Sequence, residues 1–105
     1  AAEIDALWPG LMPSLHPLRW YFETPDGERY ADFSARLAAA LTRVKDHPAP
    51  IKIMISHGVA GRVMRGIHAG LAQDEALAMP IQHGIIFRYD AGAVSEIDCN
   101  PATLD

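Results

Sequence analysis

The stretch that decides the fold is IKIMISHGVAGRVMRG, residues 51–66. Four of its first five residues are apolar, which is typical of a central strand covered on both faces in an α/β sheet. An amphipathic helix is predicted to follow, because apolar residues recur at every fourth position: Val59, Val63, Ile67 and Leu71. His57 and Gly58 stand at the junction between the predicted strand and the predicted helix. The stretch therefore predicts an α/β fold.

Helices are predicted on both sides of this stretch. From Tyr30 onward, apolar residues recur at three- and four-residue spacing, which predicts a helix with one buried face. The prolines of DHPAP, residues 46–50, end it. AQDEALAM, residues 72–79, predicts a short helix that Pro80 ends.

The two ends of the chain differ in character. Residues 1–29 predict an irregular segment, with a short helix near residues 3–8. Residues 84–98 predict a β-hairpin with Gly92 in its turn. Both hairpin strands pair with each other, so the strand at residues 51–55 has no predicted neighbour, although a central strand needs two.

Composition limits the classes of function. The 105 residues make one domain or part of one, with a net charge of −4 and no cluster of basic residues, which argues against a nucleic-acid partner. No apolar run is long enough to cross a bilayer, so we expect no membrane association. The single cysteine, Cys99, fits a reducing compartment, and we expect a cytoplasmic protein. The five histidines lie at least ten residues apart and show no metal-ligand spacing, so no metal site is predicted.

The junction at His57 and Gly58 permits two interpretations. In α/β proteins, ligands bind beyond the carboxyl ends of strands, and the unpaired amides at a helix N-terminus attract anions. Gly58 would let a phosphate approach the backbone, and an imidazole can donate to a phosphoryl oxygen. The alternative is that both residues serve packing alone. Glu28, in TPDGERY, is a second candidate, although an acidic residue before a helix also suits the helix dipole.

Taken in order, PDGERYADFSARLAAAL and IMISHGVAGRVMRGI resemble the histidine phosphatase superfamily, which has the phosphoglycerate mutase-like fold. The resemblance covers residues 17–98 and rests on Pro25-Asp26-Gly27-Glu28 and Ser56-His57-Gly58. It implies a mostly parallel sheet flanked by helices with a C-terminal hairpin. It also implies that residues 1–105 form the C-terminal part of a single phosphatase domain.

The resemblance assigns roles to named residues. It implies a phosphoric monoester hydrolase that works through a phosphohistidine. His57 would hydrogen-bond the phosphoryl oxygens, with Gly58 in the phosphate site, and Glu28 would protonate the leaving oxygen. That role requires a carboxyl group that stays protonated near neutral pH, as burial can arrange. The substrate would be a phosphorylated small molecule, and no metal or organic cofactor is implied.

The sequence departs from the family pattern at three points. Arg29 stands where a serine is usual, and Asp26 where a glycine is usual. The family's Arg-His-Gly, which carries the nucleophile, does not occur in these residues. We therefore expect the nucleophile on an N-terminal segment, supplied as a separate or cleaved chain, and expect this chain alone to be inactive.

Two other functions stay open, namely a non-catalytic phosphatase-like binding module and a mutase-type phosphotransferase. The unpaired strand also suggests pairing with a second copy of the chain.

Three smaller expectations concern packing. The aromatic patch at residues 20–22 should pack against the body of the fold. Arg62 and Arg65 should face solvent or the rim of the phosphate pocket. The glycines of the second helix should let it lie close against the sheet (Gly61, Gly66 and Gly70).

Overall fold

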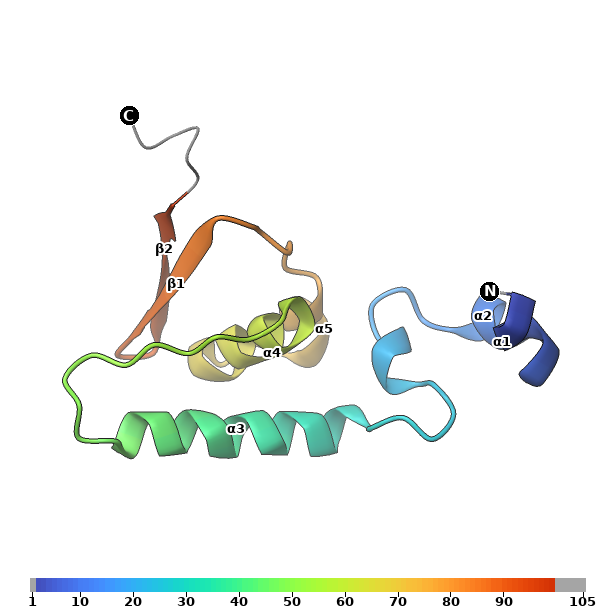
Figure 1. Ribbon diagram of the computed structural model, residues 1–105, viewed down its shortest axis with the longest axis horizontal. Coiled ribbons are helices and arrows are strands. Elements are labelled where there is room, and N and C mark those ends of the chain that lie inside the picture. The colour runs from blue at the N-terminus through green and yellow to red at the C-terminus, as the bar shows by residue number, and fades with distance from the viewer. Residues whose placement is uncertain (1, 100–105) are drawn as a thin grey trace.

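The computed structural model describes residues 2–99. The elements are α1 (Ala2–Leu7), α2 (Leu11–Ser14), the 3-10 helix η1 (Trp20–Phe22), α3 (Tyr30–Asp46), α4 (Gly58–Ala69), α5 (Gln73–Leu77), β1 (Ile85–Asp90) and β2 (Ala93–Asp98). Figure 1 shows α1 and α2 set apart from a body that contains α3, α4, α5 and the hairpin. The mixture of helices and strands confirms the α/β prediction at its coarse level.

The predicted helices are confirmed, and their ends have local causes. The helix α3 ends at Asp46 because His47 precedes a proline, which disfavours helical backbone, and His47 is extended at ψ 136°. The helix α4 ends at Gly70, whose left-handed backbone (φ 73°) returns its N–H to the carbonyls of Gly66 and Ile67.

A small core lies where α3, α4 and α5 meet. Five buried residues form it: Phe22, Leu37, Val63, Met64 and Leu77. Among them Val63 and Leu77 are at most 1% exposed. Four elements contribute these residues, so the core fixes α4 between α3 and α5.

The predicted strand at residues 51–55 is not formed in the structure. These residues belong to no sheet, and the side chains of Ile51, Ile53 and Ile55 are 82%, 86% and 97% exposed. A strand exists only through hydrogen bonds to a neighbouring strand. Figure 1 shows the segment returning from the end of α3 to the start of α4 without such a neighbour.

The predicted hairpin is confirmed. Strands β1 and β2 pair antiparallel, with Ile85 opposite Asp98 and Asp90 opposite Ala93. The turn residues Ala91 and Gly92 both have positive φ, 45° and 79°, as a tight two-residue hairpin turn requires. Within residues 2–99 this is the whole sheet, so the predicted parallel sheet does not appear there.

The aromatic patch divides between core and surface. Phe22 is buried and contacts Tyr30 and Phe33 through its ring, with centroids 5.2 Å apart in both pairs. Trp20 and Tyr21 stack on each other at 3.9 Å but stay 39% and 36% exposed. The expectation that the patch packs against the body is therefore correct for Phe22 alone.

The fold leaves an unusual amount of surface uncovered. The chain exposes 7622 Å², whereas a compact protein of this mass exposes about 5,800 Å². Its radius of gyration is 16.6 Å, compared with about 13 Å for a compact domain of this length. The excess is larger than the ~800 Å² that one partner buries in a standard protein interface. The uncovered isoleucines of residues 51–55 lie on this surface.

Candidate functional site

The N-terminus of α4 is open. His57 is its N-cap, with extended backbone (φ −116°, ψ 167°), and its carbonyl oxygen accepts the first helical hydrogen bond from the Gly61 N–H at 2.7 Å. No side chain caps the helix, and its first turn has no acidic residue. The amides of residues 58–60 therefore have no acceptor in the described part of the chain. Such amides carry the positive end of the helix dipole.

The imidazole of His57 lies on the surface. His57 is exposed, and within residues 2–99 its side chain makes no hydrogen bond. Packing therefore does not explain this histidine. Because His57 directly precedes these three amides in the chain, its imidazole could turn to donate a hydrogen bond to an anion that they bind.

Gly58, by contrast, has a packing role. A Cβ atom added there would lie 2.9 Å from Cδ1 of Ile81, so Ile81 occupies the space that a larger residue would need. Gly58 is nevertheless exposed, so its amide stays accessible. Of the two interpretations of the junction, packing accounts for Gly58 and leaves His57 unexplained.

Glu28 is held by an ion pair. The guanidinium of Arg36, two turns into α3, donates to both carboxylate oxygens: Nη2 to Oε1 at 2.8 Å and Nε to Oε2 at 3.1 Å. These hydrogen bonds, helped by the positive charge of Arg36, lower the pKa of Glu28 below its ordinary value. The proton-donor role requires a raised pKa, so Glu28 paired with Arg36 is not in the state that this role needs. Desolvation of the carboxyl group acts in the opposite direction but does not outweigh Arg36, and Glu28 is exposed.

Glu28 and His57 lie at the same end of the helical layer. Glu28 stands just before α3, and His57 just before α4. The two helices pack together and run in the same direction, with both first turns on the right in Figure 1. No hydrogen bond or ion pair joins the two side chains. The fold thus brings both predicted residues to one end without putting them in contact.

The two arginines of α4 are buried, so the prediction that they face solvent is wrong. Arg62 is 9% exposed and Arg65 is 7% exposed. Nη1 of Arg62 donates to the carbonyl oxygens of Leu77 at 2.6 Å and Met79 at 3.3 Å, which holds the end of α5 against α4. Both arginines are buried because α4 is covered by α3, α5 and β2.

Gly66 lets another element approach α4 closely, as expected, but that element is a helix and not the sheet. A Cβ atom at Gly66 would lie 2.5 Å from Cβ of Ala76 in α5. Gly61 has open space where a side chain would go, and Gly70 ends the helix. At Gly66 the close neighbour is therefore α5 and not the sheet, although α4 does contact β2 elsewhere.

Over the described range, residues 2–99, no three His, Cys, Asp or Glu side chains are grouped so as to hold a metal ion. None of the helices described here is both long enough and apolar enough to span a membrane. Comparisons with protein-family models, curated proteins and solved structures find no significant match to this chain.

Proposed function

We propose that this chain carries half of the active site of a phosphoric monoester hydrolase, with His57 and the first amides of α4 as its phosphate-binding part. The observation that carries the proposal is the exposed imidazole of His57, which makes no hydrogen bond in the described chain and belongs to the residue directly before three amides without acceptors. Such a group of donors stabilises the charge on a transferring phosphoryl group.

In the proposed reaction, a histidine on another segment attacks phosphorus and the ester oxygen leaves. Water then attacks the phosphohistidine and releases phosphate. His57 and the amides of residues 58–60 hold the phosphoryl oxygens through both steps. Glu28 is ionised while it pairs with Arg36, so it must separate from Arg36 and take up a proton before it donates that proton to the leaving oxygen. The resulting carboxylate then accepts a proton from the attacking water.

The segment that carries the nucleophile would also complete the sheet. The exposed isoleucines of residues 51–55 support this proposal, because they form an apolar strand sequence directly before His57. A strand pairing with these residues would turn them into the central strand of a phosphoglycerate mutase-like parallel sheet. It would also bring the nucleophile to the end of that strand, beside His57.

A second function, a non-catalytic phosphate-binding module, is favoured by the state of Glu28. A carboxylate paired with Arg36 is a poor proton donor, whereas phosphate binding at His57 needs no proton donor. The two functions differ in turnover. A protein that binds phosphate at His57 and hydrolyses no phosphate ester would be the module.

The experiment is hydrolysis of p-nitrophenyl phosphate by the protein assembled with the segment that carries the nucleophile, compared with His57→Ala in the same assembly. We expect turnover to fall by about two to three powers of ten, because one preorganised donor is lost in the transition state. His83→Ala is the matched control, since His83 is also exposed but precedes the hairpin. Equal turnover in His57→Ala and His83→Ala would exclude the proposed role of His57.

A further inference from the structure

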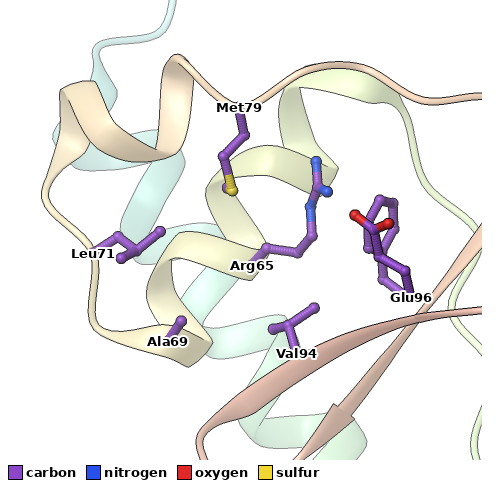
Figure 2. Close-up of a pocket in the computed structure, with 7 residues that line it drawn as sticks. Arg65, Ala69, Leu71, Met79, Val94 and Glu96 are labelled. Carbon is purple, nitrogen blue, oxygen red and sulfur yellow. The ribbon is translucent and has the colours of Figure 1, made fainter.

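A cavity of about 160 Å³ lies between α4, the chain after α5, and the hairpin. This volume is far above the ~10–15 Å³ that one water molecule needs. Figure 2 shows it between α4 and β2, with the Arg65 guanidinium between Met79 and Glu96. The lining is mostly apolar and consists of Arg65, Ala69, Leu71, Met79, Phe87, Val94 and Glu96.

Arg65 is the polar group of this cavity with unused donors. It is 7% exposed, its Nε donates to the Gly61 carbonyl oxygen at 3.3 Å, and its Cζ lies 3.8 Å from the centroid of the Phe87 ring. In the described part of the chain, neither terminal nitrogen makes a hydrogen bond. These terminal nitrogens are not among the buried atoms of the described chain that lack a partner, so they keep access to solvent and are free to donate to a molecule that enters the cavity.

The neighbouring ionisable groups leave these two nitrogens without an acceptor in the described chain. Burial lowers the pKa of Arg65, and the electrostatic effects of Tyr89 and Glu96 act against this while Arg62 adds to it. Burial also raises the pKa of Tyr89, so its hydroxyl is neutral near neutral pH. Glu96 attracts Arg65 without forming a hydrogen bond or ion pair with it. The cavity therefore retains an unpaired positive group.

We propose that this cavity binds a small aliphatic carboxylate, with its two oxygens on the terminal nitrogens of Arg65 and its hydrocarbon chain against Leu71, Met79 and Val94. The planar guanidinium matches a carboxylate in geometry. The apolar walls suit a hydrocarbon chain and offer no further donors for a phosphate dianion. Glu96 at the edge repels a second negative charge, which also favours a monoanion.

The test is an NMR titration of the protein with hexanoate, with hexan-1-ol as the neutral probe of equal chain length. We expect saturable shifts at Val94, Phe87 and Leu71 with hexanoate, and weaker binding of hexan-1-ol. Shifts spread evenly over the surface, or equal affinity for both probes, would overturn the proposal.

Two variants test whether Arg65 binds the carboxylate of hexanoate. Arg65→Met keeps the side chain's length and should weaken hexanoate binding about tenfold or more, because a charge-assisted hydrogen-bonded pair is lost. Arg88→Met is the matched control, since Arg88 is exposed on β1, and should leave the affinity unchanged. Equal weakening in both variants would show general attraction to surface charge and overturn the proposal.

Glu96→Gln provides a test that does not remove a buried group. It should strengthen hexanoate binding by about two- to threefold, because a carboxylate near the ligand is neutralised. Unchanged or weaker binding would contradict the placement of the ligand beside Glu96. This result is independent of phosphate binding at His57, which lies at the start of α4.

Discussion

Residues 51–55 and the hairpin of β1 and β2 are similar in sequence and opposite in structure. Both are rich in isoleucine and both are predicted as strands. The hairpin forms because its partner strand follows after the two-residue turn Ala91-Gly92. Residues 51–55 have no partner in the described chain, and Ile55 is 97% exposed. The difference shows that an apolar strand sequence specifies a strand only when a neighbour is within reach.

The strongest test of this comparison contrasts a buried leucine with an exposed isoleucine. Leu77→Ala should lower the free energy of unfolding by about 2–5 kcal/mol, because Leu77 is 1% exposed in the core. Ile55→Ala should change it by less than about 0.5 kcal/mol. Thermal or urea unfolding of the two variants measures both values. A similar loss in both would mean that residues 51–55 are covered in solution, and the comparison would fail.

Hydrogen exchange sharpens the same comparison at the backbone. The amides of residues 85–90 and 93–98 that pair across the hairpin should be protected, whereas those of residues 51–55 should exchange freely. Adding a partner segment that completes the sheet should protect residues 51–55 and leave the hairpin unchanged. Protection of residues 51–55 in the protein without a partner would show a pairing that the structure does not contain.

Two glycine substitutions should change the stability of the protein in opposite directions. Gly92→Ala forces alanine into positive φ (79°) at the hairpin turn and should destabilise by about 1 kcal/mol. Gly61→Ala meets no atom within 4 Å inside α4 and should stabilise by up to about 1 kcal/mol. The midpoint of thermal unfolding measures both. A stabilising Gly92→Ala would contradict the turn geometry.

The smallest expected effect concerns the ion pair of Glu28 and Arg36. Because the folded-state pKa of Glu28 is lowered, the pair contributes stability above the unfolded-state pKa, and this contribution is lost as the pH falls through the folded-state value. An NMR titration of the Glu28 carboxyl should give a pKa below the ordinary value. In Arg36→Gln the pKa should return toward it, whereas in Arg43→Gln it should not. An unchanged pKa in Arg36→Gln would exclude the pairing.

Local signals in the sequence predicted most of the elements. The spacing from Tyr30, the apolar stripe that begins at Val59 and the turn at Gly92 all act within one element or between adjacent ones. These interactions do not depend on the rest of the chain, so α3, α4, α5 and the hairpin lie where they were predicted.

The predictions that failed concern contacts between different elements. The burial of Arg62 follows from its contact with the end of α5, fifteen residues away, which no periodicity within α4 indicates. The pairing of Glu28 with Arg36 spans eight residues and joins a loop to a helix, so the usual helical spacing of ion pairs does not predict it. The sequence predicted that His57 directly precedes a helix, as it does in the structure, but not the ion pair of Glu28.

The most direct test of the central claim is an NMR titration of the protein with inorganic phosphate. The account predicts saturable shifts of the His57 imidazole and of the amides of residues 58–60, lost in His57→Ala and kept in His83→Ala. Phosphate at millimolar concentration that leaves these signals unchanged, or shifts them equally in both variants, would contradict the assignment of His57 to a phosphate site.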